Sequence, residues 1–205
     1  MTHTLHRRGD ISSLQEDYVV LVMAAQGVNV QGSEPKFQKL WDICSRHKIE
    51  NFGEAMTGNR YTFSLEDLKK KRCLVGHAVF KDKETLTRFI QELKEAELGL
   101  STVVSGLYDD VKGCCGKLGI QLHTVEHSLG IHGNTQKLPP EPVLEIHTMC
   151  GHAMVAPNLI KAMVEEVRKG KKTAEAAADE LARHCGCGIF NPYRAAKLLR
   201  KMAAA

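Results

Sequence analysis

Two short segments in the C-terminal third of the chain repeat one pattern of residues that could bind a metal. Cys150–Pro157 and Cys185–Pro192 align without gaps at an offset of 35 residues and share the pattern Cys-Gly-(His/Cys)-small-apolar-apolar-x-Pro. Thiolate and imidazole groups are ligands of zinc and of iron–sulfur clusters. The repeat therefore predicts one shared Cys3His site built from four side chains: Cys150, His152, Cys185 and Cys187.

The residues around these side chains are typical of metal-binding loops. Gly151 and Gly186 each separate two candidate ligands, and glycine allows a turn tight enough to direct both side chains toward one point. Pro157 and Pro192 favour the start of a helix directly after each loop. A helix N-terminus carries a partial positive charge and free N–H groups, and both stabilise a thiolate. We therefore expect two similar loops that face each other across one metal centre.

The identity of the metal is predicted from the residues that follow the ligands. Both loops are rich in glycine and lead into apolar residues, which favours a bulky [4Fe–4S] cluster shielded from water and bound by Cys150, Cys185 and Cys187. If only three cysteines bind such a cluster, one iron lacks a protein ligand and can act as a Lewis acid. His152 is then either the fourth ligand or a base. The alternative cofactor is zinc, which Cys3His sets bind at structural sites.

Other histidines and cysteines are weaker candidates for chemistry. His123 and His127 would share a metal on a helix, but the alternation in Leu122–Ile131 favours a strand, which separates them by about 13 Å. We therefore predict that His127 is an isolated acid or base, the second candidate catalytic residue beside His152. Three further cysteines are interpreted as core residues: Cys44, Cys73 and Cys114.

Buried strands and amphipathic helices alternate along the first two thirds of the chain. Four apolar or alternating runs predict strands: Tyr18–Met23, Cys73–Phe80, Leu100–Ser105 and Gln121–Ile131. Apolar residues at helical spacing predict helices between them, with N-caps at three residues: Ser33, Ser64 and Asp82. Such alternation is typical of βαβ units. The predicted fold class is therefore α/β, with a mostly parallel sheet built from βαβ units, followed by a helical C-terminal part that carries the Cys-rich loops.

The segment Gly133–Pro142 is the predicted boundary between two regions, because it contains glycine, asparagine and three prolines. We expect an α/β domain over residues 15–133 and a helical Cys-loop region over residues 143–205 that packs on it. Val143–Thr148 is predicted as a last strand. Three helices are predicted after it, over Pro157–Arg168, from an N-cap at Thr173 to Arg183, and from Pro192 to Met202.

Composition excludes several classes of protein. The net charge is only +4 and aromatic residues make up 5% of the 205 residues, so the basic stripe and aromatics of a nucleic-acid-binding protein are missing. No apolar run approaches the ~20 residues that a membrane helix needs. The N-terminal residues lack the apolar core of a signal peptide, and seven cysteines, an odd number, argue against a disulfide framework. These features predict a cytoplasmic protein.

The first functional hypothesis is an iron–sulfur enzyme of the lyase or sulfur-handling type, acting on a small anionic or sulfur-containing substrate. The first alternative is a non-catalytic, zinc-stabilised module that binds a partner or serves as an accessory subunit. The second alternative is an electron-transfer subunit. A homo-oligomer or a partner subunit is compatible with each of these. The chain has no P-loop and no G-x-G-x-x-G motif, so nothing indicates that it binds a nucleotide.

Overall fold

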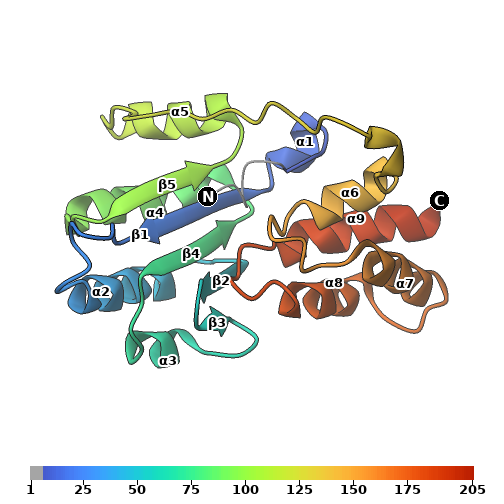
Figure 1. Cartoon of the computed structure of the whole chain (residues 1–205), viewed down its shortest axis with the longest axis horizontal. Helices are drawn as coiled ribbons and strands as arrows, with labels where there is room; N and C mark the ends of the chain where they lie inside the picture. Colours follow the sequence, from blue (N-terminus) through green and yellow to red (C-terminus); the bar gives the residue numbers. More distant parts are fainter. Residues whose placement is uncertain (1–6) are drawn as a thin grey trace.

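A computed structural model describes residues 7–205 of the chain (Figure 1). The strands are β1 (Tyr18–Met23), β2 (Asn51–Glu54), β3 (Gly58–Asn59), β4 (Val75–Phe80) and β5 (Ser101–Ser105). The helices are α1 (Ile11–Leu14), α2 (Glu34–Ser45), α3 (Leu65–Lys69), α4 (Lys83–Ala96), α5 (Tyr108–Lys117), α6 (Glu141–His147), α7 (Pro157–Arg168), α8 (Ala174–Arg183) and α9 (Pro192–Ala204), with a 3-10 turn at Thr135–Lys137. Among these described residues, no helix has both the length and the apolar character needed to cross a membrane.

The five strands form one sheet in the order β3-β2-β4-β1-β5, and every neighbouring pair is antiparallel. The expectation of a mostly parallel sheet is therefore wrong. Tyr18 lies opposite Phe80 in the β1–β4 pair, and Val19 lies opposite Ser105 in the β1–β5 pair. β4 is therefore the central strand, and β1 is an interior strand that pairs with β4 on one edge and with β5 on the other.

The alternation of strands and helices is real, but a third strand separates the two parallel strands of each βαβ unit. β4 and β5 both run antiparallel to β1, so they are parallel to each other and α4 connects them across β1. In the same way, α2 connects β1 to β2, and β4 lies between those two strands. Two split βαβ units interleave in this manner, and interleaving makes every adjacent pair antiparallel.

One face of the sheet packs against α2 and α4, which lie behind it in Figure 1. Tyr18, Val20 and Val22 reach this face from alternate positions of β1. They pack in one cluster with the fully buried side chains of Trp41 from α2 and Phe89 from α4. The residues of this core come from the part of the chain before the C-terminal helices.

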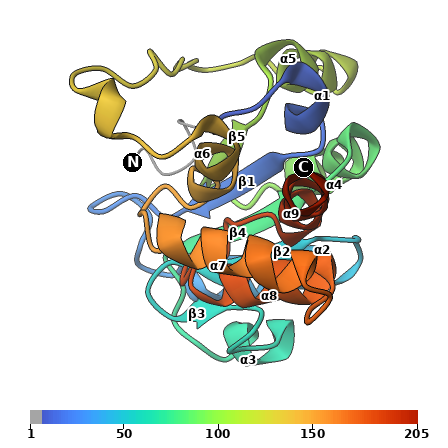
Figure 2. The ribbon, with the colours of Figure 1, turned by 90° about the vertical axis from the view of Figure 1, so that its right-hand side faces the viewer.

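A second core joins the opposite face of the sheet to the C-terminal helices. Val19 and Val79, which lie opposite each other in the β1–β4 pair, pack in one cluster with buried residues of α6, α7, α8 and α9. Figure 2 shows these four helices in front of the sheet. The three buried cysteines of the repeated motif belong to this second core: Cys150, Cys185 and Cys187. The candidate metal ligands thus lie where the helical region meets the sheet.

Two further predicted strands are absent at their expected positions. Gln121–Ile131 forms no strand and is almost entirely exposed, because the sheet provides no partner for its alternating pattern. Residues 143–147 belong to α6, and Thr148 is the C-cap of that helix. A short apolar run suits a strand and a buried helix equally well, and here Pro142 in the first turn starts a helix.

Candidate metal centre

The two Cys-Gly loops repeat in conformation as well as in sequence. Cys150 follows α6 and Cys185 follows α8, and each loop leads into the next helix. In the first loop the Ala153 amide donates to the Cys150 carbonyl at 3.0 Å, and in the second the Gly188 amide donates to the Cys185 carbonyl at 3.0 Å. Both amides belong to residues in the left-handed region, with φ of 57° at Ala153 and 75° at Gly188. The aligned residues thus form the same turn twice.

The four predicted ligands form a chain of contacts between the loops. The Cys150 thiol hydrogen-bonds to the sulfur of Cys185. The sulfurs of Cys185 and Cys187 are 4.0 Å apart, and Cys187 Sγ is 3.8 Å from Nδ1 of His152. All three cysteines are buried, whereas His152 is exposed. Among the four predicted ligands, the three sulfurs therefore lie in the interior, and the imidazole of His152 lies at the solvent-exposed side.

The hydrogen bonds between the thiols favour a thiolate at Cys187. Cys150 donates to Cys185, and this bond together with burial raises the pKa of Cys150. At Cys185 the bond from Cys150 lowers the pKa, but the bond to Cys187 and burial outweigh it and raise the pKa to about 12. At Cys187 the hydrogen bond with Cys185 lowers the pKa despite burial. The most acidic sulfur is thus the one next to the exposed imidazole.

The two distances at Cys187, 4.0 Å to Cys185 Sγ and 3.8 Å to His152 Nδ1, are close to those around a single tetrahedral ion. With metal–sulfur bonds of ~2.3 Å, two thiolates on one ion lie about 3.8 Å apart. Sulfurs on different irons of a [4Fe–4S] cube lie roughly 6 Å apart. Within the described residues, no three or more His, Cys, Asp or Glu side chains are arranged so that they could hold a metal ion. The side chains instead touch in pairs, and a metal ion would have to draw them together around one point.

β2 packs directly against the second Cys loop, and glycine is needed on both sides of this contact. A Cβ atom at Gly188 would lie 2.3 Å from the carbonyl oxygen of Phe52. A Cβ atom at Gly53 would lie 2.7 Å from the carbonyl oxygen of Cys187. Such separations do not occur between non-bonded atoms, so the two backbones approach this closely only because both residues lack a side chain.

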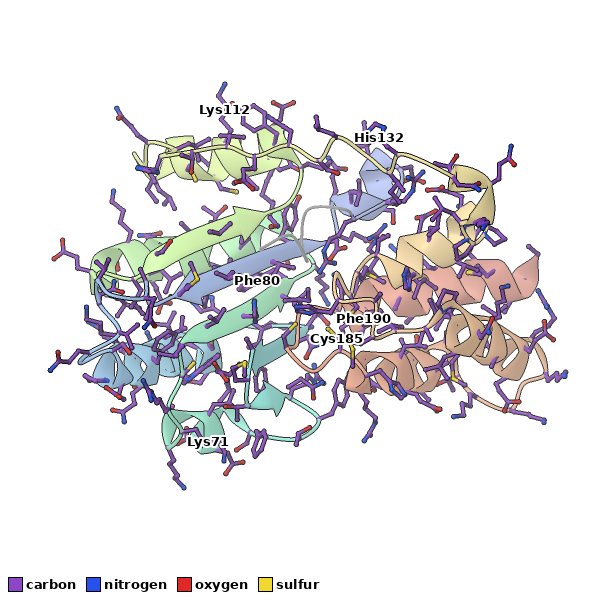
Figure 3. The ribbon with its side chains drawn as sticks, viewed as in Figure 1. Lys71, Phe80, Lys112, His132, Cys185 and Phe190 are labelled. Atoms are coloured by element: carbon purple, nitrogen blue, oxygen red, sulfur yellow. The ribbon has the colours of Figure 1, made fainter. Side chains whose placement is uncertain are left out.

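Two buried asparagines fix the same loop from the sheet. Asn51 on β2 donates to the Phe190 carbonyl at 2.8 Å, and Asn59 on β3 donates to the Cys185 carbonyl at 2.9 Å. Figure 3 shows Cys185 and Phe190 at the junction between the sheet and the C-terminal helices. Sequence reasoning did not identify either asparagine. The sequence around them carries little signal. Asparagine is uncommon in strands, and neither residue lies beside an alternating apolar run that would predict a strand.

The conformation of Gly188 leads to a testable prediction. We expect Gly188→Ala to lower the free energy of unfolding by about 2–4 kcal/mol, because alanine is strained at this positive φ and its Cβ would displace β2. Gly186→Ala in the same loop is the matched control, since Gly186 is exposed and a Cβ atom there has no neighbour within 4 Å. Urea unfolding of both variants measures the difference. Equal stability of the two variants would contradict the packing described above.

A buried ion network lies behind both loops. The carboxylate of Asp17, just before β1, pairs with Arg7 at 2.5 Å and with Arg194 on α9 at 2.8 Å. The Asn191 amide donates to Asp17 Oδ1 at 3.1 Å. Burial raises the pKa of Asp17, but the two guanidinium groups outweigh burial and lower it overall. These residues connect the start of β1 to α9, and sequence reasoning did not identify them.

The remaining candidate residues lie apart from this centre. His127 is exposed, and its ring contacts Tyr108 with the centroids 5.4 Å apart. Tyr108 is the first residue of α5, and Figures 1 and 2 show α5 at the opposite side of the sheet from α8, which precedes Cys185. The structure therefore does not bring His127 together with the four predicted ligands. The cysteines interpreted as core residues are buried in the sheet core: Cys44, Cys73 and Cys114.

No protein-family model, curated protein or solved structure matches this chain.

Proposed function

We propose that this protein is a metal-stabilised module in which one metal ion, bound by Cys150, His152, Cys185 and Cys187, ties the C-terminal helices to the sheet. The observation that carries the proposal is the pair of contacts at Cys187, whose sulfur lies 4.0 Å from Cys185 Sγ in its own loop and 3.8 Å from His152 Nδ1 in the other loop. Zinc is the proposed ion, since Cys3His is a structural zinc set and zinc favours a tetrahedral geometry.

The position of the donors supports a structural role for the ion. The three sulfurs are buried in the core that connects Val19 and Val79 of the sheet to the C-terminal helices. An ion at this point would cross-link α6 and α8, and through the second loop it would fix β2. Metal binding in such a site contributes directly to folding. The module would thus act as a binding or accessory unit, and it needs the reduced thiols that the cytoplasm maintains.

An iron–sulfur enzyme is the second candidate function. It is favoured by the exposure of His152 and of its neighbours Gly151 and Met154, which gives one side of the centre access to solvent. A cluster with one open iron would use that side for a small anionic or sulfur-containing substrate. The donor spacing favours the single ion, because a cube would require the sulfurs to separate by roughly 2 Å.

Anaerobic purification followed by metal analysis and an absorbance spectrum tests the proposal. We expect a colourless protein with about one zinc per chain, because four donors surround one ion. A brown protein with iron, sulfide and broad visible absorption would favour the iron–sulfur enzyme. A protein that folds fully without any bound metal, and takes none up when zinc is added, would overturn both functions.

A further inference from the structure

A single arginine from the N-terminal part of the chain bridges the two Cys loops. Arg7 Nη2 donates to the Met149 carbonyl at 3.3 Å and to the Ile189 carbonyl at 2.5 Å. Met149 immediately precedes Cys150, and Ile189 lies two residues after Cys187. One guanidinium group thus holds the backbone of both loops at a fixed separation.

The bridging guanidinium is itself held firmly in place. Arg7 Nη1 donates to both carboxylate oxygens of Asp17 at 2.5 Å, and the Arg7 side chain is only 6% exposed. Arg194 shares the Asp17 carboxylate at 2.8 Å, but its other side-chain hydrogen bonds go to Ser13 and Arg8 and not to the Cys loops. Arg7 therefore differs from Arg194 in connecting the ion network directly to the candidate metal centre.

We propose that metal binding at the Cys centre and docking of the chain at Arg7 are thermodynamically coupled, so that each stabilises the other. This inference rests on the proposed metal site. Arg7 is a positioning residue: it sets the separation of the loops that carry the ligands, and it does not bind the metal. Removing such a supporting contact typically weakens metal affinity by about 10–100-fold. Linkage requires the converse, that the metal stabilises the docked Arg7 by the same factor.

Trypsin cleavage of the wild-type protein measures the coupling from the Arg7 side. Zinc-loaded protein is compared with metal-free protein from which the chelator has been removed. We expect cleavage after Arg7 to be about 10–100-fold faster without zinc, since docking then lacks the contribution of the metal. Cleavage after Lys137, which lies in an exposed 3-10 turn, is the internal control and should not change. Equal rates after Arg7 with and without zinc would overturn the coupling.

Cobalt titration measures the coupling from the metal side, with Arg7→Lys as the test and Arg8→Lys as the matched control. Lysine preserves the charge beside Asp17, but the three N–H groups on its one nitrogen cannot replace all four contacts of Arg7, two to the Asp17 oxygens and two to the loop carbonyls. The Arg8 guanidinium, in contrast, pairs with exposed Glu141. We expect Arg7→Lys to bind Co²⁺ about 10–100-fold more weakly, with altered thiolate-to-cobalt absorption, and Arg8→Lys to match the wild type. Identical affinity and spectra in all three proteins would overturn the proposal.

The two proposals fail in different ways. If wild-type protein takes up neither Co²⁺ nor Zn²⁺, the metal site itself is wrong and the coupling falls with it. If wild-type protein binds one ion per chain but cleavage after Arg7 is independent of zinc, the metal site stands and only the coupling is wrong. The cleavage experiment uses the wild-type chain, so it decides the question even if Arg7→Lys does not fold.

Discussion

Cys185→Ala is expected to abolish metal binding and to lower the free energy of unfolding by about 4 kcal/mol, beyond the packing loss, when zinc is present at ~1,000 times its dissociation constant. Cys185 lies at the centre of the donor chain, since it contacts both Cys150 and Cys187. Its loss removes the sulfur that connects Cys150 to Cys187. Metal analysis and urea unfolding with and without zinc measure the two effects.

Cys44→Ala is the matched control for this variant. Both cysteines are buried, with 0% exposure at Cys185 and 1% at Cys44, so both substitutions remove the same atoms from a core. Cys44 lies in the sheet core with α2, and burial raises the pKa of its thiol. We expect Cys44→Ala to cost about 1 kcal/mol and to retain a full complement of zinc. Equal metal content in the two variants would contradict the assignment of Cys185 as a ligand.

Asp17→Asn is expected to lower the free energy of unfolding by about 3–5 kcal/mol, because it removes the carboxylate that pairs with two buried guanidinium groups. Glu145, at 3.5 Å from Arg194, compensates for only part of this loss. The side chains of Asp17 and Arg194 are 0% and 1% exposed, so solvent cannot replace the lost carboxylate. The control is Glu141→Gln, which removes an ion pair to Arg8 whose partners are 52% and 36% exposed. Exposed pairs contribute about 0–1 kcal/mol. Urea unfolding of metal-free protein separates the two cases, and a loss below about 1 kcal/mol in Asp17→Asn would contradict a buried network.

The contribution of Asp17 should also depend on pH in a defined direction. Its folded-state pKa is below the ordinary value of 3.8, so the stabilisation is fully present above that value. It is lost as the pH falls below 3.8 and through the lower pKa of the folded state. The difference in unfolding free energy between wild type and Asp17→Asn should therefore be constant near neutral pH and shrink in acid. A difference that grows as the pH falls would have the wrong sign for this network.

Local signals in the sequence predict the helices well and the sheet only in part. Asp82, Ser64 and Thr173 cap α4, α3 and α8, and each side chain accepts a bond from the first turn of its helix. The run Tyr18–Met23 is β1 without any change of bounds. Strand order has no comparable local signal, because pairing depends on which distant strand fits between two others. Strands and helices alternate along the sequence in the same way whether the two parallel strands of a βαβ unit are neighbours in the sheet or are separated by a third strand.

β2 illustrates why part of the sheet is missing from the prediction. Its sequence is Asn-Phe-Gly-Glu, with no apolar run and no alternation. Glu54 nevertheless lies 2% exposed, because its carboxylate accepts the amides of Met56 and Thr57 at 2.9 and 2.7 Å. Hydrogen bonds of this kind allow a carboxylate to be buried, whereas hydrophobic patterning predicts that it is exposed to solvent.

The candidate site, like the sheet, is predicted in part by local sequence signals and depends in part on contacts with distant segments. The repeat of Cys-Gly-(His/Cys) is local, and the structure brings its four side chains into contact. The contacts that position the loops come from distant segments: Asn51, Asn59, Gly53 and Arg7. The glycine between the two ligands of each loop is expected from the sequence to be the essential one, and the structure revises this expectation. Gly188, which follows the second loop's ligands, is the glycine that packing against β2 requires.

X-ray absorption at the zinc edge of anaerobically purified protein is the most direct test of the proposed single-metal centre. The proposal predicts one zinc per chain, with three sulfur neighbours at about 2.3 Å and one nitrogen neighbour at about 2.0–2.1 Å. His152→Ala should remove the nitrogen neighbour and leave the three sulfurs. Zinc surrounded only by oxygen and nitrogen, or iron with a second iron in its nearest shells, would contradict a single Cys3His ion at Cys150, His152, Cys185 and Cys187.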